Sequence, residues 1–518
     1  MIKELELSVL PDFINDYDYL KKLSAENLKL NTNEIDSILI LKKSIDSRRR
    51  TVFRIKINVF INETPKEINS NFQFNPVNKN KKVIIIGSGP AGLFSALKFI
   101  ESGVKPIIFE RGKNVRDRRF DLKSVMKNGI VNEDSNYCFG EGGAGTYSDG
   151  KLYTRSNKRG NVNRILDLLI YHGANKEIAV DAHPHIGSNK LPKIIQNIRE
   201  TILNCNGEIH FNSKVTDFIL AEKKIIGVVV NNSEEYYADS VIVATGHSAR
   251  DIYEIFKKHN LKLDAKPFAV GVRIEHPQEL IDSIQYHSKI RHENLPAANY
   301  SLACQVNNKG VYSFCMCPGG IIIPASTNQN ELVLNGMSVS KRNSPYANSG
   351  IVVEVNEKDW QHLTHFKEFA GLKFQQELEI SAYQFGGGKQ SAPAQRLTDF
   401  TNNKNSKSLP KSSYIPGLKS ANLNELFPKQ ISDSLKKSLM EFNKKMKGFY
   451  TEEAQILAIE SRTSSPIRIP RNSETLMHVE IEGLFPAGEG AGYAGGIVSA
   501  AVDGERCAEK SASYLTQK

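Results

Sequence analysis

Three closely spaced glycines follow a short apolar segment, and their spacing suits a bound phosphate group. Residues 82–86 read KVIII, typical of a parallel strand buried on both faces, and residues 87–92 read GSGPAG. Gly87 permits a tight turn, Gly89 leaves room for a pyrophosphate, and Gly92 lets the next helix pack closely on the strand. The N–H groups that open this helix, together with its dipole, attract the phosphates.

A second strand and an acidic residue complete this pattern. The apolar helix expected over 93–100 is followed by an apolar strand at 106–109 and then by Glu110. Glu110 lies roughly 20 residues past the glycines, where a carboxylate can accept hydrogen bonds from ribose hydroxyls. Because a glycine-rich turn without a ligand would not account for this acid, we predict a dinucleotide-binding βαβ unit.

Three later segments are also rich in glycine and small residues. Residues 139–151 read FGEGGAGTYSDGK, residues 239–246 read DSVIVATG, and residues 484–504 read LFPAGEGAGYAGGIVSAAVDG. The first can bring backbone N–H groups close to a large planar ligand. The second is predicted to be a buried strand, and the third a strand, a turn and a small-residue helix.

Together these segments resemble the two-dinucleotide-binding-domain flavoproteins, and in particular the uncharacterised FAD-dependent dehydrogenases of bacteria. The stretches that carry the resemblance are 138–145, 244–250, 314–320, 391–396, 460–465 and 487–504. The resemblance implies FAD as cofactor, with Glu489 at its ribityl chain or ribose and the helix near Gly495 directed at the flavin ring. The expected cofactor contacts are Gly87, Gly89, Pro90, Ala91, Gly92, Glu110, Arg111, Gly142, Gly143, Ala144, Gly145, Thr245, Gly246, His247, Gly488, Glu489, Gly495, Gly496 and Ile497.

The sequence contains no second strand–glycine–helix fingerprint for NAD(P)H. Its absence favours an oxidoreductase in which a small organic substrate exchanges a hydride directly with the flavin. This substrate could be an anion. NAD(P)H in another binding mode, or a separate acceptor, would return the flavin to its starting state. Two alternatives stay open, an FAD-dependent RNA-modifying enzyme and a non-catalytic flavin-binding scaffold or sensor; in the favoured hypothesis nucleic acid is not a partner.

Cys315 and Cys317 lie one residue apart, after a strand predicted over 311–315. One interpretation is a redox-active or substrate-attacking thiol close to the flavin. The other is a pair of sulfurs on opposite faces of a strand, one of them buried, since a disulfide across so short a loop would be strained. No nearby Cys or His pair completes a ligand set, so no metal site is predicted.

Several charged residues are further candidates. Arg462 lies just before the return to the FAD-binding segment, where it can clamp a carboxylate or phosphate or form a structural ion pair with Glu460. Arg396 is a weaker candidate for the same role. An extended chain would place His183 and His185 on one face as proton donors, although isolated histidines are more often ordinary hydrogen-bonding residues.

Asp149 and Lys151 lie at the end of the glycine-rich segment 139–151, and a lysine near the flavin would stabilise its reduced form. His247 follows a predicted strand end and is interpreted as a flavin or diphosphate contact. The candidate catalytic residues are therefore Lys151, His183, His185, Cys315, Cys317 and Arg462.

These motifs predict an α/β chain in three parts. An N-terminal α/β unit and its linker occupy 1–78, and a Rossmann-like FAD-binding domain is built from 79–262 and 475–518. An α+β substrate domain over 263–474 interrupts it. Within that domain, 332–339 is a predicted strand that the turn at Pro318-Gly-Gly320 separates from 311–315.

Two other segments of the substrate domain have a distinct composition. The polar stretch 402–422 is too long for an ordinary connection, so it is either mobile or laid across another surface. Apolar residues from Ile431 to Met446 recur at helical spacing with lysines opposite, which predicts a surface helix packed on a domain.

In the N-terminal unit, strands are predicted over 3–9 and 51–61, and a helix over 14–25. Residues 34–47 are interpreted as a second helix because their apolar residues recur every three to four positions. Arg48 to Arg50 would contact phosphate or RNA, or stand solvated at a turn.

Composition places the chain among globular proteins of the cytoplasm. It has 518 residues with 40% hydrophobic and 24% charged, and its six cysteines suit a reducing compartment rather than a disulfide framework. The glycines within the apolar run 83–100 argue against a membrane span, and no signal peptide is recognised. The net charge of +11 suits anionic ligands or reflects a lysine-rich composition.

Overall fold

The glycine-rich segments are carried by one parallel sheet in the computed structural model, which describes residues 1–63, 72–77, 81–153 and 160–517. Its strands run in the order β22-β10-β4-β5-β6. Their bounds are β4 (Lys82–Ile86), β5 (Lys105–Phe109), β6 (Glu208–His210), β10 (Ser240–Val243) and β22 (Leu484–Pro486). Because β22 comes from the C-terminal part and pairs with β10, the two ends of a long insertion meet in this sheet. The predicted α/β fold with a Rossmann-like domain is confirmed.

Small residues let two helices of this domain lie against each other. The Ser95 hydroxyl of α2 (Pro90–Glu101) donates to the Gly504 carbonyl of α12 (Ile497–Thr516) over 2.8 Å. A Cβ at Gly504 would lie 2.1 Å from the Ala91 oxygen, so only glycine permits this approach. The remaining elements are α3 (Val115–Asn128), α4 (Val162–Tyr171), α5 (Leu191–Asn204), α6 (Arg250–Lys258) and the meander β7 (Val215–Ala221), β8 (Lys224–Val230) and β9 (Glu234–Tyr237). In the part of the chain that the structure describes, no helix is long and apolar enough to cross a membrane.

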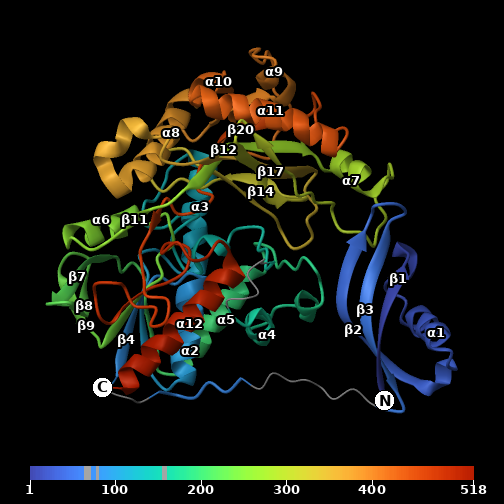
Figure 1. The fold of residues 1–518 in the computed structure, drawn as a ribbon, viewed down its shortest axis with the longest axis horizontal. Coiled ribbons are helices and arrows are strands. Elements are labelled where there is room, and N and C mark those ends of the chain that lie inside the picture. Colours follow the sequence, from blue (N-terminus) through green and yellow to red (C-terminus); the bar gives the residue numbers. More distant parts are fainter. Residues whose placement is uncertain (64–71, 78–80, 154–159, 518) are drawn as a thin grey trace.

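A seven-stranded sheet forms the inserted domain above the parallel sheet (Figure 1). Its strands, in spatial order, are β13 (Ala303–Val306), β14 (Lys309–Cys317), β17 (Tyr346–Val355), β12 (Phe268–Pro277), β20 (Gln455–Glu460), β18 (Ala392–Arg396) and β19 (Leu418–Ser420). The helices α8 (Ala370–Phe385), α10 (Leu423–Leu426) and α11 (Lys429–Lys445) cover this sheet on its outer side. The predicted amphipathic helix is α11, which buries Ile431, Leu435, Leu439 and Phe442 completely.

The other elements of this domain are short. They are α7 (Gln278–Tyr286), α9 (Leu397–Thr401), and two ribbons, β11 (Asp264–Ala265) with β21 (Ile467–Arg468) and β15 (Ile321–Pro324) with β16 (Leu334–Met337). β15 was not predicted from the sequence, and the turn at 318–320 joins β14 to β15. The strand predicted over 332–339 is present as the shorter β16. The polar stretch 402–422 is laid across the sheet: it contributes β19, and the Ser413 amide lies 3.2 Å from a carboxylate oxygen of Glu275 on β12.

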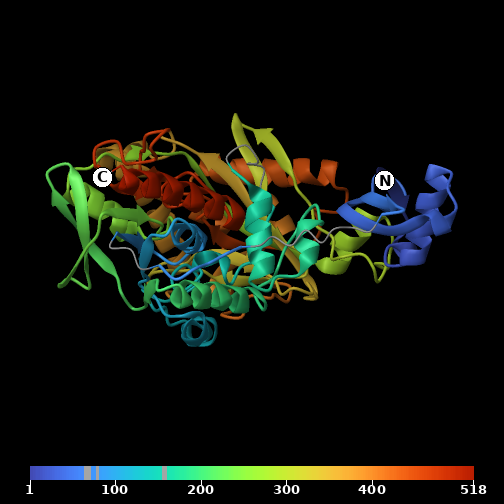
Figure 2. The same ribbon diagram turned by 90° about the horizontal axis from the view of Figure 1, so that it is seen from below.

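The N-terminal unit projects from one end of the molecule (Figure 2). It consists of β1 (Ile2–Val9), α1 (Tyr17–Leu28), β2 (Ile35–Asp46) and β3 (Val52–Ile61), with β3 in the centre of an antiparallel sheet. The prediction of a helix over 34–47 is wrong, because most of these residues form the strand β2. The register of β2 shifts at Ile35/Ser37 and again at Ile40/Lys42, and these irregularities turn the alternation of a strand into helix-like spacing. The predicted linker lies largely outside the described residues.

Candidate functional site

A cavity of about 400 Å³, here called the cofactor cavity, opens where β4, β10 and β22 end. Ligands of open α/β sheets bind at this edge, beyond the carboxyl ends of the strands. Seventeen of the expected cofactor contacts line it: Gly87, Gly89, Pro90, Ala91, Glu110, Arg111, Gly143, Ala144, Gly145, Thr245, Gly246, His247, Gly488, Glu489, Gly495, Gly496 and Ile497.

Two expected contacts, Gly92 and Gly142, do not line the cofactor cavity. A Cβ at Gly92 would lie 2.0 Å from the Gly87 oxygen, so this glycine is needed for helix-to-strand packing. Gly142 has φ +79°, and a Cβ there would lie 2.0 Å from the Thr146 hydroxyl. Both residues shape the turns that hold the wall of the cavity.

The cavity offers space where a dinucleotide needs it. A Cβ added at Gly246 or at Gly495 would meet nothing within 4 Å, and one added at Gly89 would meet only the Gly143 Cα at 3.9 Å. Gly89 precedes Pro90, the first residue of α2, so the N-terminus of that helix borders the cavity. The residues present therefore fit a pyrophosphate group lying over glycine backbone.

Glu110 reaches the wall of the cofactor cavity in a fixed position. One carboxylate oxygen accepts hydrogen bonds from the Ser88 amide at 2.9 Å and the Ser88 hydroxyl at 2.8 Å. The other accepts from the amides of Gly112 at 2.9 Å and Gly140 at 3.0 Å. The carboxylate thus ties the first glycine turn to the second glycine-rich segment, and its sequence position alone did not indicate this.

Arg118 was not predicted as a site residue, but its side chain supports the second glycine-rich segment, residues 139–151. It extends from α3, is completely buried, and donates to the carbonyls of Asn136 at 2.8 Å, Glu141 at 2.9 Å and Gly143 at 2.9 Å. Its burial lowers the pKa of its guanidinium from the ordinary value. A single buried cation therefore fixes the loop that carries the cavity wall.

Glu489 and His247 are neighbours in the wall of the cofactor cavity, and His247 Nε2 lies 4.0 Å from Glu489 Oε1. Burial raises the pKa of Glu489 to about 7, although Lys266 opposes the shift. Burial and the charges of Arg462 and Arg250 lower the pKa of His247 to about 3, so this imidazole is neutral at pH 7. Near neutral pH, therefore, Glu489 changes its charge and His247 does not.

A second cavity of about 810 Å³ meets the cofactor cavity beside the N-terminus of α12. The residues that line both cavities are Lys151, Tyr153, Phe314, Cys315, Gly495 and Gly496. Its volume lies within the range of about 300–1,000 Å³ that small-molecule sites occupy. Ligands bound in the two cavities would therefore lie side by side.

The structure separates the candidate catalytic residues into four groups. Lys151 and Cys315 line both cavities, Arg462 lines only the cofactor cavity, and His183 lines only the second cavity. His185 lines neither. Cys317, also outside both, is a completely buried residue of β14.

The prediction that His183 and His185 share one face toward a ligand is wrong. His183 is exposed and packs against Tyr153, with ring centroids 5.0 Å apart. His185 is half-buried, and its Nε2 lies 3.2 Å from the Ser340 carbonyl. The backbone of His185 forms an isolated antiparallel β-bridge with Lys151, and the residue lines neither cavity.

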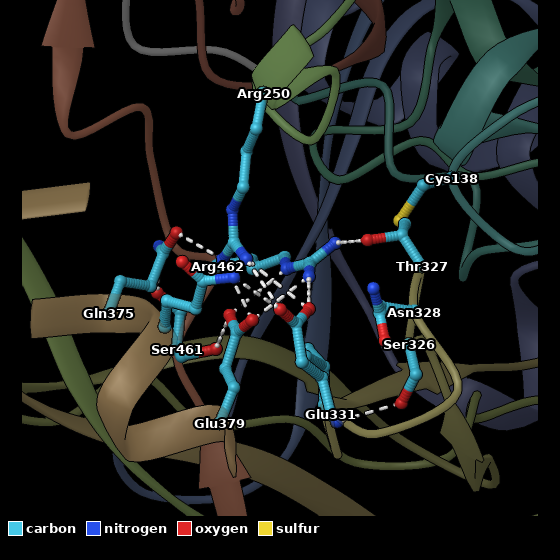
Figure 3. Close-up of polar contacts among 12 residues, drawn as sticks. Cys138, Arg250, Ser326, Thr327, Asn328, Glu331, Gln375, Glu379, Ser461 and Arg462 are labelled. Carbon is cyan, nitrogen blue, oxygen red and sulfur yellow. Dashed lines mark hydrogen bonds and ion pairs between the residues drawn. The ribbon is translucent and has the colours of Figure 1, made fainter. Parts of the chain in front are cut away.

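Arg462 belongs to a buried cluster of two arginines and two glutamates (Figure 3). Its guanidinium donates to Glu379 at 3.0 and 3.1 Å, to Glu331 at 3.3 Å and to the Thr327 hydroxyl at 2.8 Å. Arg250, at the start of α6, donates to the same carboxylates at 2.7 and 3.1 Å. The cluster joins the Rossmann-like domain to the inserted domain.

Of the two alternatives for Arg462, the structural ion pair with Glu460 is wrong, because Arg462 pairs with Glu331 and Glu379. Glu460 pairs with Arg273 of β12, whose guanidinium is completely buried, and burial raises the pKa of Glu460 to about 7 although Arg273 opposes the shift. Arg396 lines neither cavity and donates to the carbonyls of Ser408 and Glu452, both at 2.8 Å. Its proposed role as a ligand clamp at the flavin therefore does not hold.

Comparison with known proteins decides the family. A family model described as FAD-dependent protein, C-terminal domain-like, matches residues 267–463, and one described as pyridine nucleotide-disulphide oxidoreductase matches 81–264. A domain of unknown function matches 1–60. A protein of Clostridium beijerinckii named only as uncharacterized is 38% identical over 516 residues, which cover 96% of each chain. The chain belongs to this uncharacterised FAD-dependent family.

FAD is thus the cofactor, and the residues that line the cofactor cavity fit it. Similar solved structures include CtdE in complex with FAD, 12% identical over 85% of this chain and 84% of that chain, with a TM-score of 0.33. A geranylgeranyl bacteriochlorophyll reductase-like protein from Thermoplasma acidophilum and the flavin-dependent brominase Bmp2 are each 13% identical over 84% of this chain and 79% of theirs, with TM-scores of 0.36. TM-scores this low carry no argument about substrate or reaction.

Replacing Arg118 by methionine should weaken FAD binding by about 10- to 100-fold, because several loop carbonyls lose their buried donor. The measurement is FAD affinity by fluorescence quenching on refolded apoprotein. Arg116→Met, on the exposed face of the same helix, is the matched control. Equal FAD affinity in both variants would show that Arg118 does not support the loop.

The raised pKa of Glu489 predicts that FAD binds more weakly as the pH rises. Below its pKa of about 7 the side chain is neutral, and above it the new negative charge repels the cofactor phosphates. We expect FAD affinity to fall about 3- to 10-fold from about pH 6 to about pH 8. Glu489→Gln should flatten this dependence, whereas the exposed Glu474→Gln should keep it. An unchanged slope in Glu489→Gln would contradict the assignment.

Proposed function

We propose that the protein transfers a hydride between FAD and a small anionic substrate held in the second cavity. The observation that carries this proposal is the shared wall of the two cavities at Lys151, Cys315 and Gly495. When bound, FAD supplies the two-electron chemistry. The chain supplies a site in which the substrate touches the cofactor without a nicotinamide between them.

The charges around the second cavity favour an anion. Lys151, Arg342 and Arg506 line it, and Asp503, the one carboxylate among the described residues of its wall, is paired with Arg471 at 2.6 Å. Arg342 is itself paired with the buried Asp149 at 2.6 Å, while Lys151 lies 3.7 Å from that carboxylate. Lys151 and Arg506 therefore leave a positive surplus that can bind a carboxylate or phosphate.

His183 is the residue that supports proton transfer. The protein atoms around the His183 ring partly desolvate it although the residue is exposed, and together with the charges of Arg342 and Lys151 they lower its pKa below the ordinary value of 6.5, which favours the neutral ring at pH 7. A neutral imidazole in the cavity wall can accept the proton that a substrate hydroxyl or amine releases as its hydride leaves. The N-terminus of α12, at the junction of the cavities, favours negative charge that develops there.

The test is anaerobic bleaching of the flavin by NADH, NADPH and a panel of small carboxylates and phosphates. We expect members of the panel to bleach it. Lys151→Met should raise the KM for an active anion by about 10-fold or more, because it removes a cation from the cavity. Lys123→Met, on the exposed face of α3, should not. If NADPH bleaches the flavin within the mixing time and no member of the panel does, direct transfer from an anionic substrate is wrong.

A further inference from the structure

Cys315 occupies an irregular point of β14, in the wall between the two cavities. The register between β14 and β17 runs to Phe314 opposite Gly350 and resumes at Cys317 opposite Asn348. Between these pairs Cys315 has φ +45°, a conformation that side-chain-bearing residues rarely adopt. A bulge of this kind re-aims a side chain, and strained backbone persists where the surrounding structure holds it. Here the irregularity brings Cys315 to both cavities.

Cys317 lies directly behind Cys315. It is completely buried, and its thiol donates to the Cys315 carbonyl over 3.2 Å. Neither residue is in a disulfide. One sulfur is thus placed at the cavities and the second is held close behind it, out of reach of solvent.

Two cations lie beside this pair, the buried Arg273 and the partly exposed Lys151. Arg273 donates to the Cys315 carbonyl at 2.7 Å and lies 3.6 Å from the Cys317 sulfur, and the Lys151 ammonium donates to the Met316 carbonyl. A hydrogen bond from Cys317 and the charges of Lys151 and Arg273 hold the pKa of the Cys315 thiol well below its usual range, against the effect of burial. The same hydrogen bond and burial raise the pKa of Cys317 well above it. Cys315 is therefore the more readily ionised and more nucleophilic of the two thiols.

We propose that Cys315 and Cys317 form a redox couple, a dithiol that alternates with a Cys315–Cys317 disulfide and exchanges two electrons with FAD. This inference rests on the proposed function, for which it supplies the electron acceptor. The pair lies in the inserted domain, outside the residues matched by the oxidoreductase model at 81–264. A disulfide across one intervening residue is strained, and strained disulfides accept electrons more readily.

The electrons balance in two steps. The Cys315–Cys317 bond breaks as it takes two electrons and one proton from reduced FAD, which leaves the Cys315 thiolate and the Cys317 thiol. The Cys315 thiolate then attacks a small-molecule disulfide in the second cavity and releases its first half as a thiolate. Cys317 gives up its proton and attacks the Cys315 sulfur, which restores the internal disulfide and releases the second half, so that one thiolate and one thiol leave together.

The experiment counts electrons and thiols in the purified holoprotein. Anaerobic dithionite titration of the air-oxidised protein should consume about four electrons per flavin, two for FAD and two for the disulfide. Cys315→Ser and Cys317→Ser should each consume about two. Cys304→Ser, a half-buried cysteine of β13 away from both cavities, should behave as the wild type.

Mass spectrometry after alkylation in denaturant provides a readout that does not depend on turnover or on the folding of a variant. The chain has six cysteines, so the air-oxidised wild type should take up four alkyl groups and the reduced protein six. Six alkyl groups in the oxidised protein, or two electrons per flavin in the wild type, would overturn the inference while leaving the flavin function intact. Protein that holds no flavin but forms the disulfide would contradict the proposed function and show that the pair does not act with FAD.

Discussion

Replacing Gly89 by alanine should give a folded protein that has lost most of its FAD. An added Cβ would meet no protein atom closer than 3.9 Å, and the backbone at Gly89 has φ −71°, which alanine adopts without strain. The methyl group would instead occupy the space in which the pyrophosphate approaches the chain. We expect the dissociation constant of FAD to rise on the order of 100-fold, which corresponds to about 3 kcal/mol. Fluorescence titration of the apoprotein with FAD measures this effect.

Two other glycines make this result interpretable. Gly310→Ala, on β14, would place its Cβ 3.2 Å from the flexible end of Glu354, and it should leave both FAD binding and stability unchanged. Gly92→Ala would place its Cβ 2.0 Å from the Gly87 oxygen, so it should destabilise the domain itself. A Gly89→Ala protein that binds FAD as tightly as Gly310→Ala would show that the pyrophosphate does not lie over Gly89.

Removing Glu379 should destabilise the protein by about 3–5 kcal/mol, because it leaves Arg250 and Arg462 buried with one carboxylate fewer. Glu379 is completely buried and accepts hydrogen bonds from both arginines and from the Ser461 hydroxyl at 2.7 Å. Glu379→Ala is compared by urea unfolding with Glu377→Ala, whose side chain is 53% exposed on the same helix. Equal midpoints in the two variants would mean that the cluster does not join the domains.

The same cluster predicts a specific acid sensitivity. Burial alone would raise the pKa of Glu379, but the charges of Arg250 and Arg462 lower it to about 2. Because its pKa is depressed in the folded state, the stabilisation is present above the ordinary value of 4.5 and is lost as the pH falls toward about 2. Glu379→Ala should lack this part of the acid-dependent loss, which unfolding measured from about pH 5 to about pH 3 would show.

The features that were predicted correctly from the sequence depend mainly on residues close together in the chain. The strand, glycine turn and helix from Lys82 to Glu101 follow from local pattern, and so does the helix that begins after Gly496. The error at 34–47 has a local cause as well, since the two irregularities of β2 give a strand the apolar spacing of a helix. Periodicity alone does not distinguish these cases.

The polar contacts of the site could not be predicted, because they join residues far apart in the chain. Arg462 lies two positions from Glu460 but pairs with Glu379 of α8 and with Glu331, which precedes β16, and the tertiary fold brings both beside it. Arg118 belongs to a helix rich in charged residues, and no feature of the sequence marks it as the one that is buried. Arg250 had a detectable signal, since it directly follows the Ala-Thr-Gly-His-Ser-Ala segment that borders the cofactor cavity.

The most direct test of FAD binding in the cofactor cavity is the absorbance spectrum of the purified protein, followed by identification of the flavin released on denaturation. We expect flavin absorbance bands and about one FAD per chain, since the cofactor cavity is lined by the glycines of a single dinucleotide site. Protein without flavin absorbance, which also fails to bind added FAD, would contradict the assignment of the cavity and every step built on it.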